Sequence, residues 1–180
     1  MPLNDAAAKN RAGVDDAYEV AVLGGGCFWG MQDLIRALDG VVKTDVGYSG
    51  GAVETASYDV VHHGTSGHAE SVRVVFDPKK LSYERLITYF FHIHDPTTPN
   101  RQGNDVGTQY RSVIFAQTAE QLRIATEVRD RLDASGKLPR KVTTHLVAAM
   151  PYVLAEDSHQ DYLQRHPGGY TCHYERKFEF

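Results

Sequence analysis

A cysteine that directly follows three glycines is the first feature of this sequence that could carry chemistry. The stretch AVLGGGCFWG, residues 21–30, sets Cys27 between Gly26 and the aromatic pair Phe28 and Trp29. Apolar residues recur at helical spacing beyond it, which places Cys27 at the N-terminus of a predicted helix. Unpaired backbone N–H groups and the helix dipole would lower the pKa of the thiol there, so Cys27 is a candidate nucleophile. The alternative is a small buried apolar residue, as free cysteines often are.

The residues next to Cys27 indicate which kind of ligand could bind beside its thiol. The glycines at 24–26 permit positive φ and close backbone approach, which a strand-to-helix turn needs when it exposes a side chain at its apex. Nucleotide-binding patterns fail, because Trp29 stands where G-x-G-x-x-G requires its last glycine and Met31 where a phosphate-binding loop requires lysine. Phe28 and Trp29 are instead predicted to wall an apolar pocket beside the thiol. Packing of Trp29 in the core is the alternative.

A glutamate at a predicted core-facing position is the second candidate. Glu70 opens the strand 70–76 and shares the parity of Val72, Val74 and Phe76, so its carboxyl is predicted to point toward the core. Burial raises the pKa of a carboxyl, and a glutamate that is protonated near neutral pH suits general-acid catalysis. The alternative is a strand-end carboxylate that neighbouring donors satisfy.

Histidines are numerous but do not fall at metal-binding spacings. The middle of the chain holds His62, His63, His68, His92 and His94. His92 and His94 are two positions apart and would lie on nearly opposite faces of a helix, whereas helical metal pairs are spaced by three or four. The chain also lacks a Cys-x-x-Cys pair. We therefore predict no metal site and interpret these histidines as polar surface residues.

Hydrophobic periodicity predicts the elements that must position these residues. Strands are predicted at 17–23, 41–47, 70–76, 110–116 and 141–147, and helices from Phe28 to Gly40, from Ser82 through Phe91 and from Thr118 to Gly136. Thr118 and Gln121 fit a capping box. The order β-α-β-β-α-β, followed by a further helix and strand, predicts an α+β fold. We expect a two-layer sandwich with a split βαβ, ferredoxin-like core and helices packed on a mixed or antiparallel sheet.

The predicted domain organisation is simple. A length of 180 residues suits one domain, and we predict a flexible N-terminal segment at 1–16 followed by a single catalytic domain at 17–180. Two long, polar, Gly-rich segments, 47–69 and 94–109, are predicted to be functional loops without regular structure. The stretch HPGGY at 166–170 predicts a mobile C-terminal tail.

Composition and charge exclude several classes of partner. A formal net charge of −4 and an apolar fraction of 42% are ordinary for a globular protein, so we expect neither nucleic acid nor a membrane as partner. The first sixteen residues have no apolar run typical of a secretory signal, so we expect a cytoplasmic protein, and we take it to be a monomer. A permanent bridge between the two cysteines, Cys27 and Cys172, would be unusual in a reducing compartment, whereas a transient catalytic one would not.

The sequence around Cys27 resembles that of a known family. The run Gly-Gly-Cys27-Phe28-Trp29-Gly30 is similar to the signature of the A-type peptide methionine sulfoxide reductases. Further motifs follow in the family's order: GYSGG at 47–51, GHAE at 67–70, HDPT at 94–97, QGND at 102–105, GTQYRS at 107–112, AED at 155–157 and HQ at 159–160. The resemblance runs from about residue 19 to 174. It departs from the family's pattern at Thr55-Ala56-Ser57, where Asn-Pro-Thr is frequent, and at Ser158, where an aromatic is common.

This resemblance implies an activity and a set of roles. The activity is thiol-dependent reduction of methionine S-sulfoxide, free or in peptides and proteins, which repairs oxidised protein. By resemblance, the roles are Cys27 as nucleophile, Glu70 as acid, Tyr58 and Tyr110 as hydroxyl donors to the sulfoxide oxygen, Asp105 as a polar residue of the site, and Phe28 with Trp29 as the seat of the substrate methyl group. The substrate itself accepts the electrons, so no flavin, nicotinamide or metal cofactor is expected.

The resemblance also implies a role for the second cysteine. Attack by Cys27 leaves a sulfenic acid, which a second thiol can capture as a disulfide. The tail carries a single cysteine, Cys172 in GYTC, so by resemblance it resolves the sulfenic acid and thioredoxin reduces the Cys27–Cys172 disulfide.

Two other functions compete with this interpretation. A thiol hydrolase would also use an activated Cys27, with His68 or His159 as its base, and would not need Cys172. A non-catalytic module could bind methionine-containing peptides through Trp29 and would leave the number of free thiols unchanged.

Overall fold

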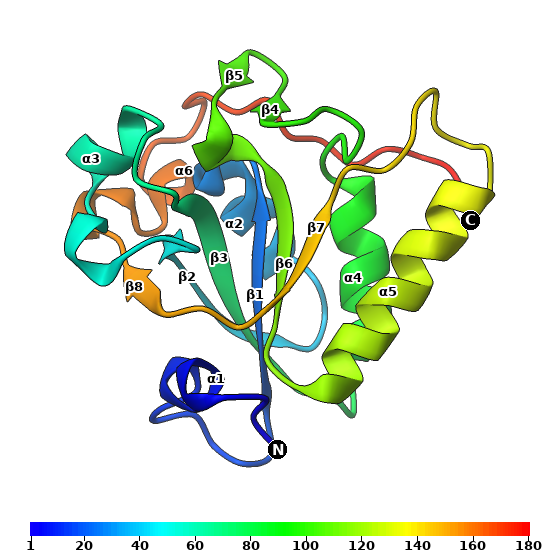
Figure 1. Cartoon of the computed structure of the whole chain (residues 1–180), viewed down its shortest axis with the longest axis horizontal. Helices are drawn as coiled ribbons and strands as arrows, with labels where there is room; N and C mark the ends of the chain where they lie inside the picture. Colours follow the sequence, from blue (N-terminus) through cyan, green and yellow to red (C-terminus); the bar gives the residue numbers. More distant parts are fainter.

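A six-stranded mixed sheet forms the centre of the protein, whose computed structural model describes all 180 residues (Figure 1). Its strands are β1 (Glu19–Gly25), β2 (Val41–Ser49), β3 (Ala69–Phe76), β6 (Ser112–Ala116), β7 (His145–Ala148) and β8 (Tyr152–Leu154). They lie in the order β7-β6-β1-β3-β2-β8. Every neighbouring pair is antiparallel except β6 and β7, which are parallel. The expected α+β fold with a mixed sheet is therefore confirmed.

Two strand-helix-strand units interleave in this sheet. Helix α2 (Phe28–Arg36) connects β1 to β2, and β3 lies between these two strands and runs antiparallel to both. Helix α4 (Tyr83–His92) connects β3 to β6, and β1 lies between them in the same way. Each unit is thus split by a strand of the other. The ferredoxin-like assignment of this core stays a prediction.

Three helices cover one face of the sheet. They are α2, α4 and α5 (Ala119–Ala134), and they pack with the sheet in a cluster of 23 buried apolar residues. Alternate residues of β3, Val72, Val74 and Phe76, face this cluster, as the period of a strand requires. The Thr118 hydroxyl accepts a hydrogen bond from the Gln121 N–H, so the predicted N-terminal cap of α5 is confirmed.

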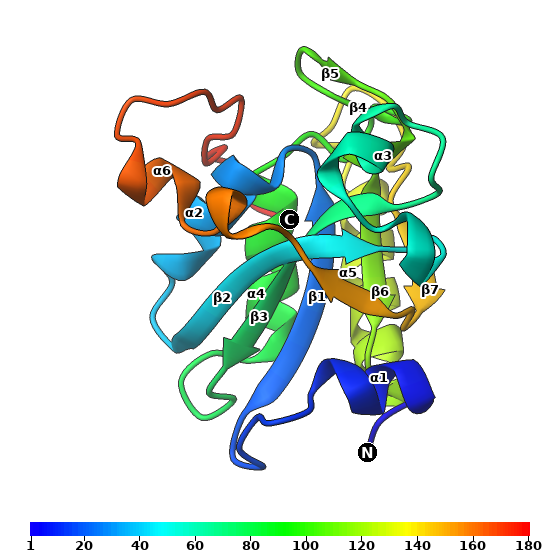
Figure 2. The ribbon, with the colours of Figure 1, turned by 90° about the vertical axis from the view of Figure 1, so that its left-hand side faces the viewer.

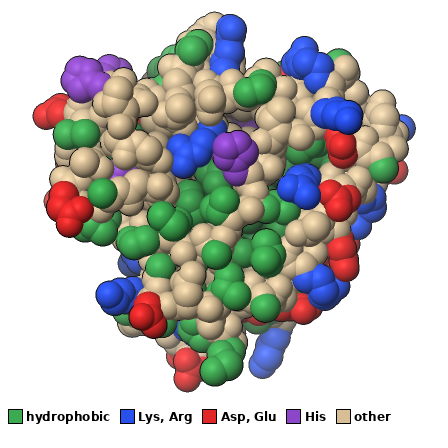
Figure 3. All heavy atoms as spheres, viewed as in Figure 1, with side chains coloured by type: hydrophobic (Ala, Val, Ile, Leu, Met, Phe, Trp, Pro, Cys, Tyr) green, Lys and Arg blue, Asp and Glu red, His purple; other side chains and the backbone are tan.

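The sheet is strongly curled because its two edge strands are consecutive in the chain. Only residues 149–151 connect β7 to β8, yet these strands are the opposite edges of six. Flat strands would be separated by about 24 Å at ~4.8 Å per strand, whereas the connection reaches about 14 Å. Figures 1 and 2 show it crossing the face that the helices leave open. Figure 3 shows hydrophobic side chains gathered over the middle of this face. The crossover itself carries one exposed large apolar side chain, that of Met150.

The N-terminal segment, expected to be flexible, contains a packed helix. Helix α1 (Asp5–Asn10) has Asn4 as its N-cap and buries Ala7 and Asn10. The Asn10 amide donates to the Gln117 side chain at 3.1 Å and to the Met150 carbonyl at 3.0 Å, and it accepts from the Tyr152 N–H at 3.1 Å. These partners of Asn10 are far away in sequence. The apolar pattern of residues 1–16 alone therefore could not predict that α1 docks on the sheet.

Several other elements differ from the expected ones. The segment predicted as a loop at 47–69 contains a 3-10 turn (Val53–Thr55) and helix α3 (Tyr58–His62), and the one at 94–109 contains the hairpin of β4 (Arg101–Gln102) and β5 (Asp105–Val106). Strand β1 lies two residues later than predicted, β6 begins after the turn Thr108–Tyr110, and 141–144 precede β7. The turn Asp157–His159 and helix α6 (Tyr162–Arg165) were not predicted. No helix has the length and apolar character needed to cross a membrane.

Replacing Asn10 tests whether α1 is part of the folded unit. Asn10→Ala leaves the Gln117 side-chain oxygen and the Tyr152 N–H without their partner, so we expect the free energy of unfolding to fall by about 1–3 kcal/mol. Urea denaturation measures the change. Lys9→Ala, an exposed change on the same helix, is the control and should stay within about 0.5 kcal/mol of the parent. Equal midpoints for the two variants would contradict the docking of α1.

Candidate active site

A cavity of about 210 Å³ brings together seven of the eight residues singled out in the sequence. Its lining consists of Cys27, Phe28, Trp29, Tyr58, His62, Glu70, Asp105, Tyr110 and Tyr170. Cys172, the eighth, lies beside it and contacts Asp105. These residues come from the end of β1, from α2, α3, β3, β5, the turn before β6 and the tail. The cavity therefore lies where the two expected loops and the tail meet the β1–α2 turn.

The glycines before Cys27 allow other chains to approach the turn closely. Only Gly26 has a positive φ, +97°, and a Cβ there would lie 2.6 Å from the side chain of Gln102. Gly24 belongs to β1 and lies against the backbone of Glu70, where a Cβ would approach the Glu70 carbonyl oxygen to 3.1 Å. Glycine is thus required for the turn at one position and for close packing at the other.

Cys27 is the N-cap of α2, as predicted, but its thiol is not acidic. The side chain is only 7% exposed. Burial is the largest influence and raises the pKa of Cys27 far above its ordinary value, and the carboxyls of Glu70 and Asp105 raise it further. The backbone N–H of Trp29 opposes these effects and lowers the pKa of Cys27, which is the contribution expected from the helix N-terminus. The prediction that the helix N-terminus lowers the pKa of Cys27 is therefore wrong for the resting protein. Burial raises the pKa by more than the helix N-terminus lowers it.

Glu70 is buried on the core-facing side of β3, as its parity predicts. Its side chain accepts a hydrogen bond from the Phe28 N–H at 3.2 Å, directly beneath the N-terminus of α2. Burial raises the pKa of Glu70 to about 8, although the Phe28 hydrogen bond opposes this shift. The carboxyl is consequently protonated at neutral pH. In that state it does not repel a thiolate on Cys27.

The two tyrosines of the pocket present hydroxyl groups that keep their protons. Burial, together with the nearby Glu70 carboxyl, raises the pKa of both Tyr58 and Tyr110 above the ordinary value for tyrosine. Tyr58 begins α3 because the Glu156 carboxylate accepts its N–H at 3.0 Å. The same carboxylate accepts from the Tyr48 hydroxyl at 2.8 Å. Glu156 therefore holds Tyr58 in the pocket despite the unusual residues before it.

Phe28 and Trp29 differ in their surroundings although both line the pocket. Phe28 is fully buried, whereas Trp29 is only partly buried and packs against the core cluster. The Trp29 indole donates to His159 Nδ1 at 3.0 Å and stacks on Tyr162 with 3.8 Å between ring centroids. Because an indole N–H only donates, His159 Nδ1 carries no proton in this arrangement. His159 and Tyr162 thus fix the orientation of the indole.

Cys172 lies at the edge of the pocket on an extended tail. Its thiol is 3.9 Å from an Asp105 carboxylate oxygen and 3.7 Å from the Gln102 carbonyl. Burial, followed by the charge of Asp105, raises the pKa of Cys172. Both cysteines are free thiols, so the structure represents the reduced protein.

Two lining residues, His62 and Tyr170, were not predicted to belong to the pocket. His62 follows Tyr58 by one helical turn and stacks on its ring with 5.2 Å between centroids. Tyr170 comes from the tail, and burial, followed by the nearby Cys172 and Asp105, raises the pKa of its hydroxyl. The only sequence signal for Tyr170 is its position two residues before Cys172.

Two of the remaining histidines do not lie where the sequence predicted, whereas His63 is exposed as expected. His68 and His94 are fully buried, contrary to the expectation of a polar surface. Both ring nitrogens of His68 are bound to the backbone, with Nδ1 accepting from Gly51 and Nε2 contacting the Ala52 carbonyl. His94 contacts the Phe90 carbonyl and the Ser112 hydroxyl. With its nitrogens occupied, His68 is poorly placed to act as the base of a thiol hydrolase. No cluster of three potential metal ligands is present.

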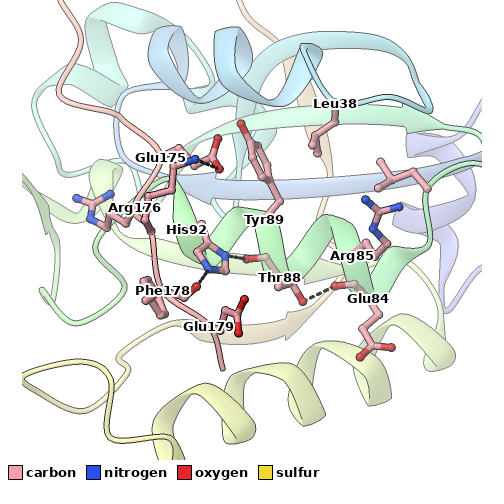
Figure 4. A pocket seen from close by; sticks show the side chains of 12 residues that line it. Leu38, Glu84, Arg85, Thr88, Tyr89, His92, Glu175, Arg176, Phe178 and Glu179 are labelled. Atoms are coloured by element: carbon pink, nitrogen blue, oxygen red, sulfur yellow. Dashed lines mark hydrogen bonds and ion pairs between the residues drawn. The ribbon is translucent and has the colours of Figure 1, made fainter.

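A larger cavity of about 630 Å³ lies between α4 and the end of the tail and contains none of the predicted site residues (Figure 4). His92 joins its two walls, since its ring nitrogens contact the Thr88 carbonyl of α4 and the Phe178 carbonyl of the tail, each at 2.7 Å. Acidic and basic side chains share its rim. The cavity thus marks where the tail is attached to the helix layer, away from Cys27.

Comparison with known proteins identifies the family. The profile of the family described as "Peptide methionine sulfoxide reductase" matches residues 19–179. The peptide methionine sulfoxide reductase MsrA of Mycobacterium ulcerans is 55% identical over 156 residues, which cover 87% of this chain and 89% of that protein. The crystal structure of reduced Mxr1 from Saccharomyces cerevisiae is similar with a TM-score of 0.86 and 36% identity, covering 91% of this chain and 95% of the other.

A second structure of the yeast protein, in complex with Trx2, has a TM-score of 0.59 and 26% identity and covers 91% of this chain and 94% of the other. The profile match spans most of the chain, and the sequence identity extends over nearly the whole length of the bacterial relative. This chain belongs to the peptide methionine sulfoxide reductase family.

Proposed function

We propose that this chain reduces the S form of methionine sulfoxide to methionine, with Cys27 as the nucleophile and Glu70 as the acid. The observation that carries the proposal is the composition of one small cavity. It combines a thiol, a carboxyl that is protonated at neutral pH and two tyrosine hydroxyls with an aromatic wall. Phe28 and Trp29 supply an apolar surface for the substrate methyl group.

The first step transfers oxygen from the substrate to Cys27. The Cys27 sulfur attacks the sulfoxide sulfur while Glu70 protonates the sulfoxide oxygen, and the hydroxyls of Tyr58 and Tyr110 donate hydrogen bonds to that oxygen. The hydroxyl on the substrate sulfur then passes to the Cys27 sulfur: the substrate S–O bond and the transient bond between the two sulfurs break, and an S–O bond forms on Cys27. The products are methionine and a sulfenic acid on Cys27. Two electrons pass from the Cys27 sulfur to the substrate sulfur. Once Glu70 has given its proton to the oxygen, the resulting carboxylate takes up the proton of the Cys27 thiol. Glu70 therefore ends the step protonated, as it began.

The second step regenerates the enzyme. The Cys172 thiol attacks the Cys27 sulfenic acid, an S–S bond forms, and the hydroxyl leaves as water with the Cys172 proton. A dithiol then reduces the disulfide by exchange. The likeness to yeast Mxr1 in complex with Trx2 supports thioredoxin as this reductant. The electrons come from thiols throughout, so the proposed cycle uses no additional cofactor.

The proposal extends to the organisation of the chain. We assign the catalytic unit to residues 17–180, with the tail carrying the resolving Cys172, and we infer a cytoplasmic monomer that repairs oxidised methionine. Two free cysteines close to one pocket suit a reducing compartment, in which a disulfide between them would form only during turnover.

An assay with separated sulfoxide epimers tests the proposal. The purified protein is given either the S or the R epimer of a methionine sulfoxide peptide together with a thiol reductant, and methionine is measured. We expect turnover of the S epimer alone. A hydrolase would release no methionine, and a binding module would bind the peptide with its thiols unchanged. Equal turnover of both epimers would contradict the assignment.

The rate of the first turnover should depend on the protonation of Glu70. The acid form is the active one, so the rate measured without reductant should fall as pH rises through about 8. Glu70→Gln should lower this rate by about 10² or more and abolish that dependence, because general-acid catalysis contributes ~10²–10⁴. Glu54→Gln, a change of an exposed carboxyl, is the matched control. A rate for Glu70→Gln within a few-fold of the parent would remove Glu70 from the chemistry.

The same substitution should stabilise the protein in alkaline solution. Glu70 binds its proton more tightly when folded, with a pKa of about 8 against an ordinary value of 4.5, so its contribution to stability is lost as pH rises between these values. Glu70→Gln removes this loss, and its advantage over the parent should grow by up to about 1.4 kcal/mol per pH unit across that interval. Denaturation at pH 5 and pH 9 measures it. A constant difference would contradict the buried, protonated carboxyl.

Cys172→Ser should separate the two steps. We expect about one methionine per enzyme at the parent rate, accumulation of sulfenic acid on Cys27 and loss of sustained turnover with thioredoxin, because the capturing thiol is gone. Methionine yield, labelling of the sulfenic acid and steady-state assays measure these three quantities. Sustained cycling of the variant, together with no Cys27–Cys172 peptide in the oxidised parent, would overturn the role of Cys172.

A further inference from the structure

The residue after Cys172 is the only buried residue beyond His159 in the chain. His173 is 7% exposed, whereas its neighbours in the tail are exposed or half-buried. Its ring Nε2 lies 2.7 Å from the carbonyl oxygen of Gly25, two residues before Cys27. Because a carbonyl only accepts, Nε2 is the donor and carries the proton. A direct hydrogen bond therefore joins the tail to the turn that presents the nucleophile.

The turn and the first part of α2 are shaped to receive His173. Gly30 has no side chain where His173 and Thr171 pack, and a Cβ there would lie 2.7 Å from His173 Nδ1 and collide with the Thr171 hydroxyl. Gly26 faces the same ring, with its Cβ position 3.2 Å from Nε2. The Thr171 hydroxyl also accepts the His173 N–H at 3.1 Å. The His173 ring thus lies in a recess that Gly26 and Gly30 leave open, one before Cys27 in the chain and one after it.

Cys172 is held from the other side by the β4–β5 hairpin. Its thiol lies near the Gln102 carbonyl and the Asp105 carboxylate, and a Cβ at Gly103 would be 3.1 Å from the Cys172 Cβ. Gln102 in turn packs against Gly26. The contacts of His173 and of the hairpin therefore converge on one point, the β1–α2 turn, with Cys172 between them.

We propose that His173 is a positioning residue that holds Cys172 next to the turn of Cys27, so that the second thiol captures the sulfenic acid. The inference rests on the proposed role of Cys172. Disulfide formation requires the two Cα atoms to come within about 7 Å. A tail attached at His173 presents Cys172 at a high effective concentration, whereas a released tail explores many other positions.

A pair of substitutions separates this role from a general structural one. In His173→Gln the amide nitrogen replaces Nε2 and can still donate to the Gly25 carbonyl. In His173→Asn the amide nitrogen lies near the position of Nδ1 and cannot reach that oxygen. His166→Asn, which changes an exposed histidine of the same tail, is the control.

The experiment follows one turnover with an S-sulfoxide peptide and no reductant. Methionine release, sulfenic acid trapped on Cys27 by a dimedone probe, and the Cys27–Cys172 peptide are measured over time. We expect His173→Asn to release methionine at the parent rate, to form the disulfide about 10- to 100-fold more slowly and to accumulate sulfenic acid. His173→Gln and His166→Asn should form the disulfide within a few-fold of the parent.

A second variant keeps the test decisive if His173→Asn fails to fold. Gly30→Ala leaves His173 unchanged, favours the helix and forces Thr171 and His173 out of their recess. It should also slow disulfide formation. Disulfide formation at the parent rate in His173→Asn or Gly30→Ala, or equal slowing in His173→Gln and His173→Asn, would overturn the proposal. A parent that forms no Cys27–Cys172 disulfide would instead refute the proposed role of Cys172.

Discussion

The hydrogen bond from the Phe28 N–H to the Glu70 carboxyl joins the two elements on which the site depends. Antiparallel pairing of β1 with β3 places Leu23 opposite Val72, so the end of β1 reaches the start of β3 where Glu70 lies. The N-terminus of α2 is then directly above a buried carboxyl. The helix N-terminus favours the charged form of that carboxyl and burial favours the neutral one. Burial prevails, and the site holds a protonated carboxyl next to the Cys27 thiol.

The parts of this arrangement that follow from local pattern could be predicted from the sequence. The long periodic helices and the buried strands were predicted because each presents an apolar face with its own period. The inward position of Glu70 follows from strand parity, and the place of Cys27 follows from the helix that begins after it. The family resemblance named Tyr58 and Asp105, which come from segments with no apolar periodicity, and Tyr110, which begins a predicted strand.

The parts that depend on contacts across the chain could not be predicted. Helix α3 begins at Tyr58 because Glu156, almost a hundred positions later, accepts its N–H. Helix α1 is fixed by partners of Asn10 near the end of the sheet. The pKa of Cys27 illustrates the same limit, since the local effect of the helix has the expected sign but the burial that reverses it comes from distant segments.

The high pKa of the resting thiol has a consequence for chemical selectivity. A protein that repairs oxidised methionine works among oxidants and electrophiles that attack exposed thiolates. Cys27 is buried and protonated, and a thiol in that state is a poor nucleophile toward such reagents. In the proposed mechanism a sulfoxide that enters the pocket accepts the Glu70 proton, and the resulting carboxylate takes the thiol proton, so the sulfur becomes reactive only when the substrate is present. The same burial that works against ionisation thus protects the Cys27 thiol from reagents of the kind that oxidise methionine.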